Sequence, residues 1–171
     1  MKIIIYLLIA SVVAMALIIG FTFVTTIIEI YSLGNRVEDS LIAAGWTGFS
    51  KADLDKLAER IDVVDEELRD IYLNKPEARD IVLEYIKMNL KLDAAFYPRE
   101  ESYICNKDNP VIVREIEIYN PDELPAVCSK GVTFERTTIH LLVSIPVDVK
   151  WLGFKYLDKH VDIDVKSFFK N

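Results

Sequence analysis

The feature that most constrains this chain is an uninterrupted apolar run near its N-terminus. Residues 3–28 include no charged residue, and Lys2 and Glu29 bound the run. A helix rises about 1.5 Å per residue, so the run spans roughly 39 Å and exceeds the roughly 30 Å hydrocarbon core of a bilayer. We therefore predict that residues 1–29 form a single, somewhat tilted transmembrane anchor that contacts membrane lipid through residues 3–28.

A cleaved signal peptide is the alternative to a retained anchor. Ala14-Met15-Ala16 has the small-x-small form of a signal-peptidase site. Cleavage there would leave a mature chain that starts with an apolar stretch at Leu17 and has nowhere to bury it. We therefore expect the anchor to be retained.

The charge distribution predicts the location of the domain and excludes one class of partner. Lys2 and the terminal amine precede the span, whereas Arg36 is the nearest cation after it. The positive-inside rule then favours a cytoplasmic N-terminus and a C-terminal domain outside the cell membrane. The formal net charge is −7, which is unfavourable for binding polyanions, so we expect no nucleic-acid partner.

The apolar spacing of a helix continues beyond the membrane span. Residues 30–45 form an amphipathic continuation, and Gly45 predicts its end. Gly34 costs about 1 kcal/mol relative to alanine and is a candidate bend. The predicted buried face, at three- and four-residue spacing, consists of Ile30, Leu33, Val37, Leu41 and Ala44.

Short helices are expected at the start of the domain formed by residues 46–171. Ser50 and Asp53 have the spacing of a capping box, which predicts a helix through Ile61, and residues 65–73 predict a further short helix. The clearest helix begins at Pro76 and extends to Leu90, because proline favours the first helical turn. Trp46 and Phe49, just before these helices, are interpreted as a hydrophobic plug, with a ligand-stacking pair as the alternative.

After Pro98 the apolar period changes to two, which is typical of strands with one buried face. The alternation predicts strands at 112–118, 139–149 and 161–165, with a weaker candidate at 102–105. Pro146 indicates a sheet edge or a bulge. Strands grouped after helices predict an α+β fold that ends in an antiparallel β-meander.

The last strand carries the candidate metal ligands. Asp158, His160, Asp162 and Asp164 alternate and point away from the core. If the last two strands form a hairpin, His140 lies opposite Asp162 or Asp164. His140, His160, Asp162 and Asp164 are thus candidate ligands for a divalent cation. The competing interpretation, which we expect, is an exposed sheet face with a His–Asp cross-strand pair and no metal.

Cys105 and Cys128 are the only cysteines. An even count in an oxidising compartment predicts one disulfide, which would contribute about 3 kcal/mol by constraining the unfolded chain. Two buried, unpaired thiols are the alternative.

The sequence carries no recognised catalytic motif. It has no P-loop, dinucleotide fingerprint, nucleophile elbow or His-Glu-x-x-His motif, and it contains two histidines. We expect no enzymatic activity and no cofactor.

The arrangement resembles the pilin-like and pseudopilin class, and more loosely the TadE-like proteins of tight-adherence pilus systems. The resembling parts are the apolar half-helix 3–28, its amphipathic continuation and the C-terminal sheet. Gly20-Phe21 even has the form of a prepilin peptidase junction, but the preceding residues are apolar and Thr25 stands where pilins usually carry glutamate. We therefore expect no cleavage before Phe21.

The resemblance implies a structural protein with partners. The expected function is a membrane-anchored extracytoplasmic structural or assembly subunit, such as a minor component of a pilus-like or secretion system, with protein partners in that assembly. The alternative is a membrane-anchored binding or sensor module.

Overall fold

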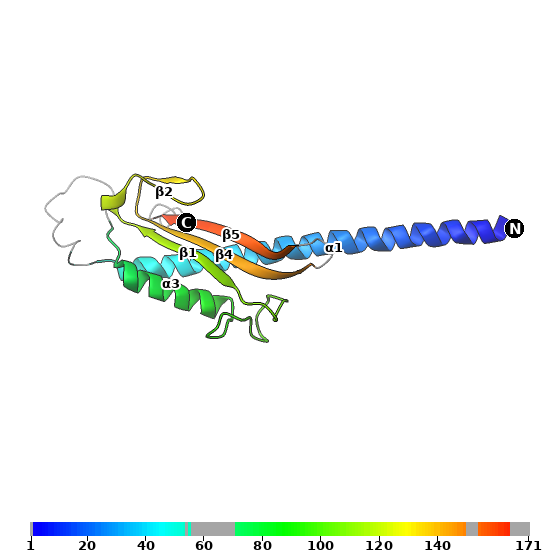
Figure 1. Cartoon of the computed structure of the whole chain (residues 1–171), viewed down its shortest axis with the longest axis horizontal. Coiled ribbons are helices and arrows are strands. Elements are labelled where there is room, and N and C mark those ends of the chain that lie inside the picture. Colours follow the sequence, from blue (N-terminus) through cyan, green and yellow to red (C-terminus); the bar gives the residue numbers. More distant parts are fainter. Residues whose placement is uncertain (1, 54, 56–70, 150–153, 165–171) are drawn as a thin grey trace.

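The computed structural model of the chain describes residues 2–53, 55, 71–149 and 154–164. Its longest element is α1 (Lys2–Gly48), one continuous helix. The first half of α1 projects alone as a stalk, and its second half packs against the rest of the chain (Figure 1). Side chains on the stalk are exposed, with Ile3 at 75% and Phe21 at 72%. Among the described helices, α1 alone is long and apolar enough to cross a membrane.

The second half of α1 forms part of the hydrophobic core, as its amphipathic pattern predicts. Val37, Leu41 and Ala44 are fully buried. They pack with the apolar faces of the sheet and of a second helix in one contiguous core. The same helix therefore supplies both the exposed apolar stalk and a central part of the core.

The predicted end of this helix at Gly45 is wrong. The helix continues through Gly45 to Gly48, and a 3-10 turn, η1 (Phe49–Lys51), follows it. A Cβ atom at Gly45 would overlap the side chain of Ile163, and one at Gly48 would lie 2.5 Å from Cδ1 of Ile139. These glycines permit a close approach of helix and sheet rather than ending the helix. The helix also continues through the candidate bend at Gly34.

The second well-formed helix, α3 (Lys75–Asn89), confirms the helix predicted from Pro76 to Leu90. Pro76 lies in its first turn, and Ala78, Val82 and Ile86 form its buried face. The helix runs back alongside the second half of α1 (Figure 1). Asn89 Nδ2 donates to the carbonyl of Ser40 on α1 at 3.2 Å, which helps to hold the two helices together.

The helix predicted to begin at Ser50 is not formed at its start. Ser50 lies in the 3-10 turn, and Ala52 is extended and forms an isolated β-bridge with Leu73. Residues 71–73, which we predicted to end a short helix, are not helical. Of the rest of these two predicted helices, residues 54, 56–61 and 65–70 lie outside the described residues.

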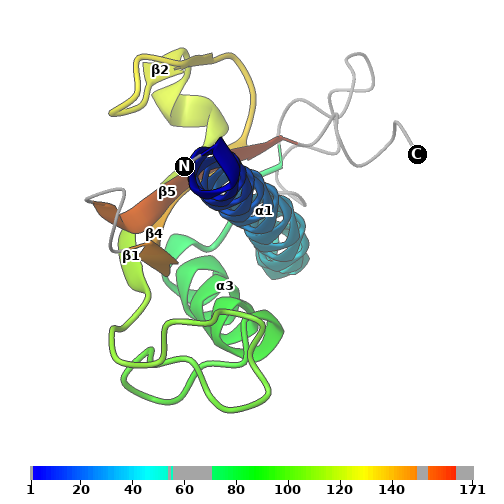
Figure 2. The ribbon, with the colours of Figure 1, turned by 90° about the vertical axis from the view of Figure 1, so that its right-hand side faces the viewer.

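The three long strands form one antiparallel sheet in the order β1 (Ile112–Tyr119), β4 (Thr138–Val149) and β5 (Phe154–Asp164). They confirm the strands predicted by alternation and the α+β fold class. Viewed along α1, the sheet stands beside the two helices (Figure 2). Its inward face contributes fully or nearly fully buried residues to the core, namely Ile139, Leu141, Val143, Ile145 and Ile163.

Two finer predictions about the sheet differ in outcome. The register of β4 and β5 shifts between Pro146 and Val149, so the predicted irregularity is present. β4 is nevertheless the central strand, and Pro146 is accommodated because the ladder with β1 reaches only as far as Ser144. The weak strand predicted at 102–105 is wrong, because these residues form no β-ladder.

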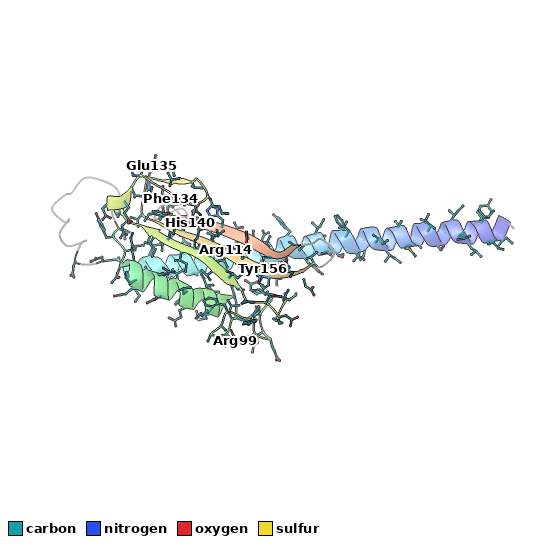
Figure 3. The ribbon with its side chains drawn as sticks, viewed as in Figure 1. Arg99, Arg114, Phe134, Glu135, His140 and Tyr156 are labelled. Carbon is teal, nitrogen blue, oxygen red and sulfur yellow. The ribbon has the colours of Figure 1, made fainter. Side chains whose placement is uncertain are left out.

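A small hairpin that we did not predict completes the fold. The 3-10 turn η2 (Pro121–Glu123) leads into β2 (Ala126–Val127), which pairs with β3 (Thr133–Phe134). Phe134 of this hairpin contacts His140 of β4, with ring centroids 6.1 Å apart (Figure 3). The hairpin thus covers part of the sheet face that points away from the helices.

Candidate functional site

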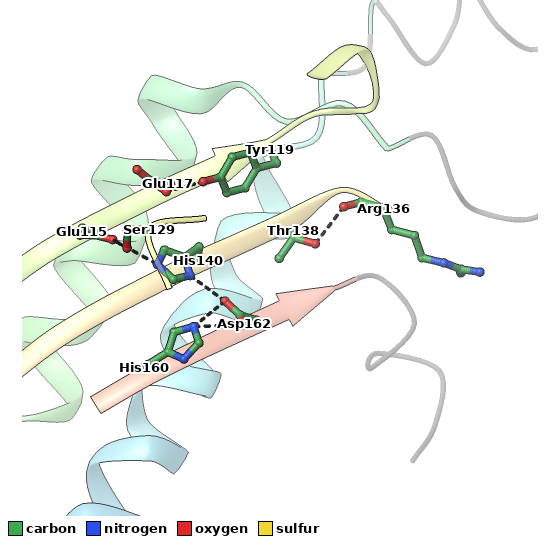
Figure 4. Close-up of polar contacts among 9 residues, drawn as sticks. All are labelled: Glu115, Glu117, Tyr119, Ser129, Arg136, Thr138, His140, His160 and Asp162. Carbon is green, nitrogen blue, oxygen red and sulfur yellow. Dashed lines mark hydrogen bonds and ion pairs between the residues drawn. The ribbon is translucent and has the colours of Figure 1, made fainter. Parts of the chain in front are cut away.

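The covered face of the sheet brings the predicted histidine and carboxylate residues together. Asp162 lies directly opposite His140 in the β4–β5 register. The Nδ1 atom of His140 lies 2.7 Å from Asp162 Oδ1, and His160 Nε2 lies 3.1 Å from the same oxygen (Figure 4). The predicted hairpin and the cross-strand His–Asp pair are therefore confirmed.

This face is not the solvated surface that the sequence suggested. The side chain of His140 is fully buried, whereas His160 and Asp162 retain 32% and 25% exposure. Phe134 and the buried Cys128 come from the unpredicted hairpin and lie over it. The outer side of the sheet therefore encloses a small polar cluster rather than a row of exposed charges.

A second carboxylate contacts His140 from the opposite strand. Glu115 of β1 places Oε2 at 3.2 Å from His140 Nε2. Both ring nitrogens of this imidazole therefore face carboxylate oxygens, and both can donate only if the ring is protonated. The two acceptors are satisfied by a cationic ring, or by a neutral ring together with another cation.

The carboxylates on β1 are held by hydroxyl groups. The Ser129 hydroxyl donates to Glu115 at 2.5 Å. This bond, together with a smaller contribution from His140, lowers the pKa of the Glu115 carboxyl against the opposing effect of desolvation. Desolvation raises the pKa of Tyr119, and the Glu117 carboxylate that accepts its hydrogen bond raises it further.

The cluster contains two sets of atoms with the spacing of metal ligands. One ligand atom from each of Cys128, His140 and His160 lies within 4.8 Å of the other two, and the same holds for Glu115, Glu117 and His140. Among the described residues, these two sets are the ones whose ligand atoms lie this close together.

The predicted ligand set is thus recovered only in part. His140, His160 and Asp162 meet, but Asp164 pairs with Thr138 farther along the strand and belongs to neither group. The positions of Glu115 and Glu117 could have been predicted from sequence, because they alternate along β1 with the inward-facing Ile116 and Ile118. No periodic pattern pointed to Cys128.

The predicted disulfide between Cys105 and Cys128 is absent, because both cysteines are free. Cys128 is buried beside the histidines, whereas Cys105 is exposed next to Val147, at the other end of β4. A disulfide requires Cα atoms about 4.4–6.8 Å apart, which this placement does not allow.

A separate groove lies where the stalk meets the domain. It has a volume of about 470 Å³ and is lined by residues of α1, the loop around Tyr103 and the end of β4, among them Arg36, Cys105 and Asp148. Tyr103 donates to the carbonyl of Arg36 at 3.2 Å, and burial raises its pKa. Trp46 and Phe49, with ring centroids 5.9 Å apart, pack against the core at the far end of α1 and do not line this groove.

Comparisons with protein-family models, with curated proteins and with solved structures find no match for this chain. What the chain shows by itself is a long N-terminal apolar helix followed by an antiparallel sheet that packs against the same helix.

Proposed function

We propose that the chain is a membrane-anchored structural or assembly subunit whose domain lies outside the cytoplasmic membrane. The single observation that carries this proposal is the continuity of α1 (Lys2–Gly48). An exposed apolar stalk and a central part of the domain core belong to one rigid helix. A domain attached in this way is held at a fixed height and orientation above the bilayer, which suits a scaffold.

The packing of α1 supports an anchor over a cleaved signal sequence. Cleavage after Ala16 would leave the exposed apolar side chains of Leu17, Ile18 and Phe21 at the start of the mature chain. Each such residue gains about 1.5–3 kcal/mol when it leaves water, so a retained membrane-embedded stalk is the favourable arrangement. The cytoplasmic N-terminus follows from Lys2 and remains part of the proposal.

The pilin-like character of the architecture supports an assembly role. In pilin-like proteins, one half of a long helix lies in the membrane or the filament, and the other half packs against an antiparallel sheet. The helix α1 is divided in the same way. A minor component of a pilus-like or secretion system is the specific form that we propose. The subunit has no enzymatic role in this proposal.

The alternative is a membrane-anchored binding or sensor module. The groove of about 470 Å³ between α1 and the end of β4 favours it, because ligand sites are commonly concave and of this size. A module of this kind would act as an individual protein with no stable protein partner.

Extraction from native membranes distinguishes the two functions. We expect the chain, extracted in a mild non-ionic detergent, to migrate in a defined complex much larger than its own mass of 19.6 kDa. Migration as a monomer, with the membrane anchor still present, would contradict the assembly role and favour the binding module.

Orientation is tested through the exposed thiol of Cys105. We expect a membrane-impermeant maleimide to label this residue in intact cells. The Cys105→Ser variant should lose the label, and the Cys128→Ser variant should keep it, because Cys128 is buried. Labelling of the wild-type chain only after lysis would place the domain in the cytoplasm.

A further inference from the structure

We propose that the covered face of the sheet binds one transition-metal ion of the zinc type through Cys128, His140 and His160. The thiol sulfur and one ring nitrogen of each histidine already lie within 4.8 Å of one another. Zinc bonds of about 2.0–2.3 Å in tetrahedral geometry place neighbouring ligand atoms about 3.3–3.6 Å apart. The ligand atoms therefore need to approach one another by at most about 1.5 Å.

The ligand types determine the class of metal. One thiolate and two imidazoles favour zinc and related borderline ions, whereas magnesium and calcium prefer sets made of oxygen ligands. Binding is a substitution without redox chemistry. The Cys128 thiol releases its proton to solvent, its sulfur forms a bond to the metal, and each imidazole coordinates through an unprotonated nitrogen.

The neighbouring carboxylates are arranged to support such a site. Asp162 contacts a ring nitrogen of His140 at 2.7 Å and of His160 at 3.0 Å, and Glu115 contacts the other nitrogen of His140 at 3.2 Å. Metal-bound histidines almost always donate their second ring N–H to a carboxylate or carbonyl, which orients the ring and increases its basicity. Both ring nitrogens of His140 face carboxylates, so the carboxylate at the coordinating nitrogen has to give way to the metal, whereas the other accepts the remaining N–H. The negative charge of these carboxylates is offset by a divalent cation.

Each ligand comes from a different part of the fold. Cys128 follows β2 in the small hairpin, His140 lies on the central strand and His160 lies on the neighbouring strand β5. The hairpin strands are two residues long, too short to be stable without packing. A metal ion would therefore fasten the hairpin to the sheet.

The proposed metal site is largely enclosed by protein and can still be reached by an ion from solvent. Cys128 and His140 are buried, so they lose little solvation on coordination, whereas His160 keeps 32% exposure. The exposed edge of His160 gives the ion a route from solvent and leaves a fourth position for a water molecule. Three protein ligands with an open fourth position is an established zinc geometry.

The proposal is tested on the reduced full-length protein in detergent micelles, using Co²⁺ as a spectroscopic probe and Zn²⁺ as competitor. We expect one Co²⁺ per chain, a thiolate-to-cobalt charge-transfer band, and displacement of Co²⁺ by one equivalent of Zn²⁺. Failure to bind Co²⁺ or Zn²⁺ would overturn the proposal, as would equal competition by Mg²⁺ or Ca²⁺.

Matched variants identify the ligands. Cys128→Ser should abolish the charge-transfer band, and Cys105→Ser, its control at the exposed cysteine, should leave the band unchanged. His160 is partly exposed, so we expect His160→Gln to leave the fold intact and to weaken Zn²⁺ binding at least about tenfold. Asp162→Asn should weaken Zn²⁺ binding about 10–100-fold. If His160→Gln binds Zn²⁺ with unchanged affinity, the assignment is wrong, even if Cys128→Ser fails to fold.

Discussion

Ile163 on β5 packs directly against the backbone of α1 at Gly45, where any side chain would overlap its Cδ1 and Cγ1 atoms. The contact joins the last described strand to the helix that also forms the exposed apolar stalk. Because the two residues are far apart in the sequence, this contact depends on the complete fold and reports directly on it.

Substitution of Gly45 therefore tests the packing of stalk helix and sheet. We expect Gly45→Leu to lower the free energy of unfolding by about 1–3 kcal/mol, because overpacking displaces Ile163 or the strand that carries it. The change is measured by thermal unfolding in detergent, with near-UV circular dichroism as the signal. Gly20→Leu is the matched control, since nothing lies within 4 Å of a Cβ atom there, and its unfolding temperature should not fall.

Asn120 is expected to be a second stabilising residue. It is buried, and its side chain accepts from Leu73 N at 3.0 Å and donates to Leu73 O at 3.1 Å. Asn120→Ala leaves both buried backbone groups unsatisfied, at a cost of about 1–3 kcal/mol for each group. Chemical denaturation should therefore show a loss of this order. Asn109→Ala, which removes a contact with another loop side chain, should change stability by less than about 0.5 kcal/mol.

The ion pair between Lys75 and Glu123 predicts a pH dependence of stability. Desolvation opposes ionisation of Glu123, but the hydrogen bonds from Lys75 and from the Asn120 backbone outweigh it and lower the pKa of the carboxyl. A lowered pKa in the folded state stabilises the fold above the unfolded value of about 4.3, and this contribution is lost as pH falls through the folded pKa.

The expected result is a small loss of stability in acid that depends on this pair. At pH 7, Glu123→Gln should be less stable than the wild-type protein by at most about 1 kcal/mol, because the pair is largely exposed. The difference should shrink towards pH 3. In a Lys75→Met background the effect of Glu123→Gln should be smaller. An undiminished difference at pH 3 would show that the ion pair is not its cause.

Local periodicity was sufficient for most of the fold. The three- and four-residue spacing of Val37 and Leu41 and the alternation of Val161 and Ile163 are produced by burial on one face, so they identify the elements directly. The prediction for Gly45 was wrong because a glycine that ends a helix and a glycine that allows close packing look alike in sequence. Gly45 was interpreted as a helix end, whereas the nearby strand residue Ile163 is what requires it.

The candidate site was predictable only as far as neighbouring strands determine it. The short connection between β4 and β5 made the pairing of His140 with Asp162 predictable. The burial of His140 was not, because it depends on a hairpin whose two-residue strands are too short to show alternation. Cys128 belongs to that hairpin, so its position beside the histidines was not predictable. Its predicted pairing with Cys105 depended only on the even cysteine count.

The retained N-terminus is the prediction that bears most directly on the anchor. Intact-mass measurement of the protein extracted from membranes should give a chain that begins at Met1, or at Lys2 if the initiator methionine is removed. The physical reason is that residues 3–24 of the stalk are exposed in the described structure, and a bilayer would bury their apolar side chains. A mature chain beginning at Leu17 would identify a signal peptide. One beginning at Phe21 would instead show prepilin-type processing, and the remaining apolar half of α1 would then have to be buried between subunits of a filament.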